Sequence, residues 1–333
     1  MRILSINIKR HSGGGTIYEE MVKKVLSDNY SEIEFENIIP LRIGKRNVSK
    51  YLLAPLILWR LFKISRRRDC SLTIRDFDSS LFLNQKPTKN IILFFHIDTS
   101  FLSFPFKIVY SFLQKLIFFN FKKADALVTI SKYWQNYFQK KGYKNIFLIY
   151  NAFNLGNYNF TSKEVEDFKK QHNLIGKPII YIGDCQKAKG VKESYDTLKD
   201  LDVFLVTSGG DPRFKVPAKY LQLEHKDFLK LLKASSIVIT MSLFKEGWCR
   251  TAHEAMLLKT PVIGSGLGGM RELLEEGKQI ICEDFDSLKA KVKYLLNHPE
   301  IREKMGEDGY SFAKNFTLER FKNDWLDLIN KLI

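Results

Sequence analysis

Two glutamates eight positions apart, Glu246 and Glu254, have the residue type and spacing that point most directly to chemistry in this 333-residue chain. Carboxylates accept hydrogen bonds from sugar and ribose hydroxyls. Residues 233–241 predict a helix end and a buried strand, so Glu246 and Gly247 should lie on the loop after that strand. A helix entered through Gly247 would place Glu254 about two turns further on. Its free N–H groups and positive dipole end could hold a diphosphate, so this spacing suits an activated sugar.

Glycines and lysines follow two other predicted strands. A glycine run containing Gly14 and Gly15 opens a predicted helix, and such a run either lets backbone N–H groups approach a ligand or is merely a permissive loop. Gly183 ends a later strand, and Lys187 and Lys189 follow it. Loop lysines are usually solvated, but these two could offset the charge that grows on a leaving diphosphate.

Other polar residues give weaker signals. His96 ends the apolar run 91–95, where a lone histidine is more often a satisfied buried residue than a catalyst. The sequences 76–78 and 284–286 match a three-residue metal motif, but they lack the acidic neighbours that a Mg²⁺ or Mn²⁺ site needs. The four cysteines are far apart in the sequence, which indicates neither a disulfide framework nor a zinc site. We therefore expect no metal ion and no cofactor.

Short apolar runs alternate with helix-length patterns, which predicts an α/β protein with parallel sheets. In the first half, strands are expected near residues 3–8, 33–35, 72–74, 91–96, 127–130 and 146–149. In the second half, they are expected near residues 178–182, 203–207, 237–241, 261–264 and 279–282. Every candidate site residue then follows the carboxyl end of a strand, where open α/β sheets bind their ligands.

Five segments carry a resemblance to a known family. Residues 244–264 resemble the glutamate, seven residues, glutamate signature of the family 4 retaining glycosyltransferases, which have the two-domain GT-B fold. In the family's order, further similarities cover the last strand of the first domain, the joining segment, the phosphate loop and a glycine turn: 125–132, 149–154, 181–190 and 266–272. Two departures are Asp184, where the family usually has arginine, and Arg250-Thr251 in place of leucine-proline.

The resemblance implies two doubly wound, Rossmann-like domains that face each other across a cleft. Residues 1–155 would bind the acceptor, residues 175–315 would bind the nucleotide sugar, and the C-terminal helix within 316–333 would cross back to the first domain. It implies catalytic roles for His96, Glu246 and Lys189, with His96 and Glu246 beside the donor sugar. The donor-binding residues it implies are Gly14, Gly15, Gly183, Lys187, Lys189, Gly247, Trp248, Cys249, Arg250 and Glu254, the last on the ribose.

The net charge of +16 is concentrated in the first half, where residues 1–150 hold 25 Lys/Arg against 11 Asp/Glu, a net of +14. This asymmetry is typical of an anionic partner, although a generic basic surface would also explain it. Segments 50–68 and 105–123 combine apolar faces with basic residues, so they could lie on an anionic membrane or simply cover the sheet. The sequence shows neither a signal peptide nor ~20 continuous apolar residues for a spanning helix. We expect a cytoplasmic protein, peripheral on the inner face of the cell membrane.

The resulting hypothesis is a metal-independent, retaining glycosyltransferase of the hexosyltransferase type, resembling those of bacterial polysaccharide and lipopolysaccharide synthesis. It would move a sugar from a nucleotide diphosphate to a hydroxyl of a glycan or a lipid-linked acceptor, without a nucleic-acid partner. One alternative is a basic nucleic-acid-binding protein, which should interleave aromatics with Lys/Arg on one exposed face. Another is a GT-B enzyme with a soluble sugar-phosphate acceptor.

Overall fold

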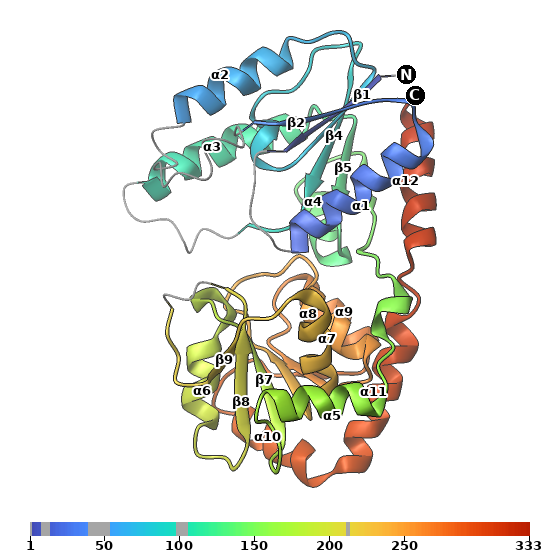
Figure 1. Ribbon diagram of the computed structural model, residues 1–333. Coiled ribbons are helices and arrows are strands. Elements are labelled where there is room, and N and C mark those ends of the chain that lie inside the picture. The colour runs from blue at the N-terminus through green and yellow to red at the C-terminus, as the bar shows by residue number, and fades with distance from the viewer. Residues whose placement is uncertain (1, 8–13, 39–53, 98–105, 211–213) are drawn as a thin grey trace. The chain divides into compact units, whose positions relative to one another are not determined.

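The computed structural model describes residues 2–7, 14–38, 54–97, 106–210 and 214–333 (Figure 1). The chain divides into two compact units. The N-terminal unit comprises Met1–Asn151 and Glu319–Ile333, and the C-terminal unit comprises Ala152–Leu318.

The N-terminal unit is built on a parallel six-stranded sheet with the order β2-β1-β3-β4-β5-β6. Its strands are β1 (Arg2–Asn7), β2 (Glu32–Asn37), β3 (Leu72–Arg75), β4 (Lys89–Phe94), β5 (Ala126–Thr129) and β6 (Ile146–Leu148). Its helices are α1 (Gly14–Asn29), α2 (Ala54–Ser65), η1 (Asp78–Leu81), α3 (Phe106–Phe121), α4 (Lys132–Lys140) and α12 (Leu318–Leu332). The six strands predicted for this half are confirmed, except that Ile8 lies outside the described residues.

The last helix returns to the N-terminal unit, as the predicted fold class requires. On α12, the rings of Phe321 and Trp325 pack edge-on against Tyr18 of α1, with centroids 5.0 and 6.4 Å from that ring. The Tyr18 hydroxyl donates to the carbonyl of Ile149 at 3.0 Å. Figure 1 shows α12 beside α1. The apolar residues of α12 recur at helical spacing because this face is buried in the unit's core.

The C-terminal unit contains a second parallel six-stranded sheet, with the order β12-β11-β10-β7-β8-β9. Its strands are β7 (Ile179–Asp184), β8 (Phe204–Ser208), β9 (Lys219–Leu221), β10 (Ile237–Thr240), β11 (Val262–Gly264) and β12 (Ile280–Ile281). Its helices are η2 (Leu155–Tyr158), α5 (Ser162–Gln171), η3 (Lys187–Lys189), α6 (Val191–Leu198), α7 (His225–Ala234), α8 (Arg250–Leu257), α9 (Gly269–Glu276), α10 (Leu288–Asn297) and α11 (Pro299–Ala313). The five strands predicted here are confirmed, and β9 is an additional strand.

Strand order in this unit fixes where a ligand site can form. From the central strand β7 the chain first winds outward through β8 and β9, and then returns to build β10, β11 and β12 on the other side. The order therefore reverses between β7 and β10. At such a switch point, the connections leave the two carboxyl ends in opposite directions and open a crevice.

Helix α8, beside this point, is largely buried. His253 is fully buried on α8, and it stacks on Phe153 with ring centroids 4.0 Å apart. Its Nδ1 accepts from the Trp248 indole N–H at 3.0 Å, and its Nε2 donates to the carbonyl of Ala313 at 3.1 Å. Burial lowers the pKa of His253 to about 3, so it stays neutral. These contacts fix α8 and the loop before it.

Candidate functional site

A lysine and a glutamate meet at the switch point of the C-terminal unit. Lys189 lies on the turn after β7, and Glu246 lies on the loop after β10. The Lys189 Nζ is 2.5 Å from Oε1 of Glu246. The hydroxyl of Ser242 donates to the same oxygen at 2.6 Å. Residues 57 positions apart in the sequence are thus brought together by the neighbouring ends of two strands.

This ion pair keeps Lys189 positively charged at the switch point. The Glu246 side chain is 6% exposed and that of Lys189 is 26% exposed. Burial alone would lower the pKa of Lys189, but the nearby Glu246 carboxylate outweighs burial and raises it above the ordinary value. Lys189 therefore stays protonated. Its partial exposure leaves ammonium protons for an anionic ligand.

The backbone of Glu246 is held by the glycine turn before α9. Its N–H donates to the carbonyl of Leu267 at 3.1 Å, and its carbonyl accepts from the N–H of Gly269 at 2.9 Å. Gly268 has a φ of +71°, and a Cβ there would lie 2.5 Å from the Glu246 carbonyl oxygen. Glycine is needed here for both its conformation and this close approach.

An unfavourable backbone conformation alone costs ~1–3 kcal/mol. Gly268→Ala is expected to lower the free energy of unfolding by more than this, because the added Cβ also displaces the loop that carries Glu246. Gly176→Ala is the matched control, since Gly176 has a φ of +92° and open space around its Cβ position. Urea denaturation of both variants measures the difference. Equal losses in the two variants would show that the contact with Glu246 is unimportant.

Glu254 lies on α8 and is 3% exposed. Its Oε1 is 3.3 Å from Nε2 of His225, 3.4 Å from Nη2 of Arg250 and 3.5 Å from the Tyr158 hydroxyl. Within the described residues, no protein hydrogen bond reaches the second oxygen, Oε2. Oε1 is thus held by three side chains, whereas Oε2 is available to accept hydrogen bonds from ligand hydroxyls.

Helix α8 begins later than the sequence predicted. Cys249 adopts a φ of +70°, which ends the loop, and the helix starts at Arg250 rather than just after Gly247. Glu254 is therefore about one turn into the helix, not two. The reason is local: the Trp248 side chain is anchored on His253, so the intervening chain must turn sharply. Burial raises the pKa of the Cys249 thiol to about 12, so this thiol is not a nucleophile.

Asp184 lies at the end of β7, among the same charges. Its carboxyl group accepts from the Tyr181 hydroxyl at 2.9 Å. Burial raises the pKa of Asp184, against the lowering effect of Lys189. The folded protein therefore binds this proton more tightly than the unfolded chain does. This contribution to stability is fully present below the unfolded pKa and is lost as the pH rises through the folded pKa.

Asp184→Asn should consequently raise the melting temperature at neutral pH, and the gain should shrink as the pH falls below about 4, where the unfolded carboxyl is protonated. Thermal unfolding of the wild type and the variant over this pH range measures it. Asp28→Asn, on the exposed face of α1, is the control for a general charge effect. A gain that does not change with pH, or a loss at neutral pH, would contradict this reading of Asp184.

The other predicted residues of the C-terminal unit lie on the same edge of its sheet but differ in exposure. Gly183 has a φ of +104° at the end of β7. Lys187 is exposed on η3 and makes no ion pair with the described residues. Trp248 and Cys249 are buried, with 2% and 8% of their surfaces exposed. Arg250 is partly exposed, and its guanidinium lies 4.3 Å from the centre of the Phe153 ring.

Three predicted residues lie in the N-terminal unit. Gly14 is the first residue of α1, and a Cβ at Gly15 would lie 3.2 Å from the Phe95 ring. His96 follows Phe95 and is exposed after β4. Gly14, Gly15 and His96 are thus close together at the carboxyl end of this sheet. Gly13, in the same glycine run, lies outside the described residues.

The two three-residue acidic motifs form turns. Asp76 accepts from the N–H of Ser79 at 2.8 Å, and Asp284 accepts from the N–H of Ser287 at 2.7 Å. Across the described residues, no group of three or more His, Cys, Asp or Glu side chains is placed to hold a metal ion. All four cysteines lie in the described residues, are buried and form no disulfide.

Three residues that contact the site glutamates are not predicted from the sequence: Ser242, Tyr158 and His225. Ser242 and Tyr158 carry no local signal, because their role depends on contacts with Glu246 and Glu254 in the folded chain. His225 is the first residue of α7, directly after the segment that contains the missed strand β9. Recognising β9 would have placed His225 at a strand end, beside the other site residues.

Comparison with known proteins gives consistent matches. Residues 162–312 match the family described as glycosyl transferases group 1. An uncharacterized glycosyltransferase of Methanocaldococcus jannaschii is 24% identical over 217 residues, which cover 59% of this chain and 57% of that protein. A trehalose synthase of Pyrococcus horikoshii is 31% identical over 126 residues, or 37% of this chain and 30% of that protein. The chain thus spans about half of the first relative's length and about a third of the second's.

Solved structures match over almost the whole chain. Sucrose-phosphate synthase from Thermosynechococcus elongatus has a TM-score of 0.78 at 17% identity, covering 99% of this chain and 98% of that one. Anabaena HepE in complex with UDP-glucose has a TM-score of 0.77 at 16% identity, covering 99% and 100%. WaaG, a glycosyltransferase involved in lipopolysaccharide biosynthesis, has a TM-score of 0.76 at 12% identity, covering 98% and 99%. The chain therefore has the GT-B fold, and within it residues 162–312 match the group 1 glycosyltransferases.

Proposed function

We propose that this protein transfers a sugar from a nucleotide-diphosphate sugar to a hydroxyl group of an acceptor, as a hexosyltransferase-type enzyme that needs no metal ion. The observation that carries the proposal is the pairing of Lys189 with Glu246 at the switch point, with Glu254 on the following helix. All three residues lie inside the range that matches the family. A fixed cation and two held carboxylates suit a diphosphate flanked by two sets of hydroxyls.

Each predicted site residue of the C-terminal unit has its own role in the proposed transfer. Lys189 neutralises the charge that develops on the leaving diphosphate, assisted by the exposed Lys187. Backbone N–H groups of the loop 247–250 and the first turn of α8 bind the diphosphate, since helix N-termini favour anions. Glu254 accepts from the ribose hydroxyls through Oε2, and Glu246 faces the sugar. Gly183 allows the backbone to approach the ligand closely.

For the N-terminal unit, the proposal assigns donor contacts to Gly14, Gly15 and His96. The support is that these three residues come together at the carboxyl end of that sheet, with His96 exposed. The imidazole would hydrogen-bond a hydroxyl of the donor sugar and orient it. The glycines would leave room for the ligand next to the backbone.

We infer that the reaction retains the anomeric configuration. The bond from C1 of the sugar to the diphosphate oxygen breaks, and a bond from C1 to the acceptor oxygen forms on the same face. The acceptor's proton passes to the departing diphosphate, which serves as the base. The protein contributes positioning and charge stabilisation through Lys189, while Glu254 anchors the nucleotide.

A UDP-sugar is the first donor to test. The support is the Anabaena HepE structures, which share the fold and were solved with UDP and with UDP-glucose. A thermal-shift screen of UDP- and GDP-sugars, followed by assays of nucleotide release with the best binder, tests the proposal. Stabilisation by one nucleotide family and sugar-dependent release are expected. No stabilisation by any nucleotide sugar would contradict the proposed function.

The proposed acceptor is a glycan or lipid-linked glycan of cell-surface polysaccharide synthesis, reached at a membrane surface. On α2, Trp59 is 58% exposed and Phe62 is 45% exposed, and on α3 Phe112 is 62% exposed and Phe119 is 57% exposed. Lysines and arginines interleave with these rings, as at the surface of anionic membranes. In the described part of the chain, no helix is long and apolar enough to cross a bilayer.

Extraction of the reaction products tests the acceptor class. With a radiolabelled donor and total lipids from a bacterium as acceptor, label should appear in the organic phase. The matched reaction contains soluble sugar phosphates, the acceptor class of the alternative enzyme. Label that stays in the aqueous phase and requires the sugar phosphate would favour that alternative.

A further inference from the structure

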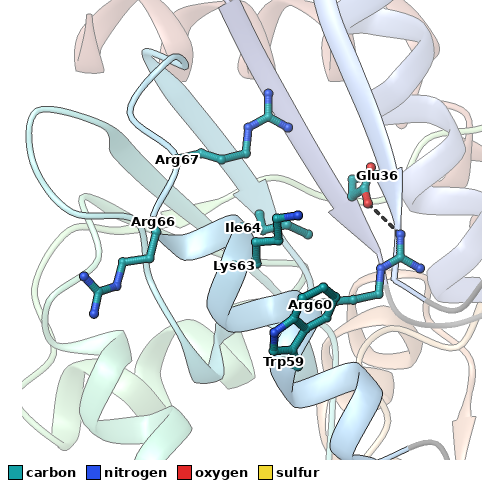
Figure 2. A pocket seen from close by; sticks show the side chains of 7 residues that line it. All are labelled: Glu36, Trp59, Arg60, Lys63, Ile64, Arg66 and Arg67. Carbon is teal, nitrogen blue, oxygen red and sulfur yellow. Dashed lines mark hydrogen bonds and ion pairs between the residues drawn. The ribbon is translucent and has the colours of Figure 1, made fainter.

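A pocket on the N-terminal unit adjoins the exposed face of α2 and has no part in the proposed transfer chemistry. It has a volume of about 370 Å³ (Figure 2). Its lining residues are Glu36, Trp59, Arg60, Lys63, Ile64, Arg66 and Arg67. Four of the seven are cations and only one is an acid, so the pocket has an excess of positive charge.

Two of the four cations are fixed by carboxylates. Arg60 donates to Glu36 at 2.9 Å, an ion pair that Figure 2 shows, and to the carbonyl of Ile38 at 2.6 Å. Arg67 donates to both oxygens of Glu34 at 2.5 and 2.7 Å. These pairs bind α2 and the segment after it to β2. Arg60 and Arg67 therefore line the pocket, but their charges are already paired with carboxylates.

The other two cations, Lys63 and Arg66, have no carboxylate partner among the described residues. Both instead lie over aromatic rings. The Lys63 ammonium is 5.3 Å from the centre of the Trp59 ring, and the Arg66 guanidinium is 4.9 Å from that of Phe62. A ring face attracts a cation without using its N–H donors. Among the described residues, two cations without a carboxylate partner thus stand beside two exposed rings.

We propose that this pocket binds the phosphate of an anionic phospholipid headgroup, with Trp59 and Phe62 entering the interface beside it. The inference rests on the membrane association in the proposed function and names the lipid chemistry that this face recognises. Lys63 supplies charge-assisted donors to the phosphate in the pocket, and Arg66, whose side chain points away from Lys63 in Figure 2, adds positive charge beside Phe62.

The exposed rings decide between a lipid and a soluble anion. A free phosphate would need only the cations, whereas aromatic rings at a membrane interface sit at the level of the headgroups. Leu56 and Leu58 of α2 are each 37% exposed and extend the apolar surface next to the rings. A ligand with a phosphate head and apolar chains matches both the pocket and this surface.

Sedimentation of the full chain with vesicles tests the proposal. The vesicles contain phosphatidylcholine alone or phosphatidylcholine with phosphatidylglycerol. The pocket variant is Lys63→Gln/Arg66→Gln, and the matched control is Lys140→Gln/Lys141→Gln. Lys140 and Lys141 are exposed at the end of α4, and Lys141 lies over the ring of Tyr137 at 5.2 Å, but neither lysine lines the pocket.

The wild type should bind the phosphatidylglycerol vesicles, and the pocket variant should bind them at least about tenfold more weakly than the control variant does. Glycerol phosphate should compete for the wild type. Equal losses in the two variants would indicate diffuse attraction and overturn the proposal. Stabilisation of the wild type by inorganic phosphate without vesicle binding would also overturn it, in favour of a soluble anion. If the pocket variant melts at a lower temperature but binds vesicles as the wild type does, the proposal is also overturned. Lys63 and Arg66 would then only stabilise the C-terminal end of α2 through the helix dipole.

The donor site provides an independent readout. The pocket variant should bind UDP as the wild type does, because Lys63 and Arg66 lie outside the C-terminal unit. If the wild type binds vesicles but no nucleotide, the proposed transfer fails and the lipid pocket stands. If it binds nucleotide but no anionic vesicle, the lipid pocket fails and the transfer stands.

Discussion

Replacing Lys189 with methionine is expected to lower kcat by about 10²–10³-fold, because the charge that grows on the departing diphosphate loses its fixed cation. The loss should appear at saturating donor, since this interaction strengthens in the transition state. Initial rates of nucleotide release and of sugar transfer measure it. Retention of full kcat in Lys189→Met would contradict the role assigned to this lysine.

Stability has to be separated from catalysis in this variant. Removing Lys189 takes away the cation that pairs with the buried Glu246 carboxylate, and breaking a buried ion pair destabilises by about 3–5 kcal/mol. Melting temperatures therefore accompany the rates, which are taken where each variant is folded. Lys189→Arg keeps the charge and should retain a measurable part of the activity. Lys192→Met removes an exposed lysine on the next helix, outside the site, and should leave kcat unchanged.

Glu254→Gln is expected to raise the KM for the donor by about 10- to 100-fold while changing kcat much less. Hydrogen bonds to a charged group are each worth about 1.5–3 kcal/mol, and the ribose hydroxyls are proposed to bind this carboxylate equally in the ground and transition states. Steady-state kinetics over a range of donor concentrations separates the two constants. Glu303→Gln, an exposed carboxylate on α11, is the control.

A fall in kcat at unchanged KM for Glu254→Gln would place Glu254 at the reacting centre rather than on the ribose. Unchanged kinetics would remove it from the site. Lys189 is expected to affect the chemical step, whereas Glu254 is expected to affect nucleotide binding.

Eleven of the twelve strands in the described residues could be predicted, most of them because buried parallel strands are short apolar runs bounded by turns. The exception, β9 (Lys219–Leu221), lies at the edge of its sheet and buries only one of its three residues. Its single strong apolar position gives no periodicity. Its strand character comes from pairing with β8 in the folded unit, which local sequence does not encode.

The positions of Lys189, Glu246 and Glu254 could be predicted because each follows a predicted strand at the same edge of the sheet. Their partners could not. Tyr158 precedes Glu254 by 96 residues, and only the fold brings the two together. The late start of α8 was likewise hidden, because a positive φ at Cys249 is uncommon for a residue with a side chain.

The dissociation constant of UDP for the wild type and for Glu254→Gln, measured by calorimetric titration at one salt concentration, decides whether Glu254 anchors a bound nucleotide. We expect saturable one-to-one binding by the wild type and at least about tenfold weaker binding by the variant. Equal affinities would rule out this role of Glu254, and a wild type that binds neither UDP nor any other nucleoside diphosphate would rule out the proposed donor site.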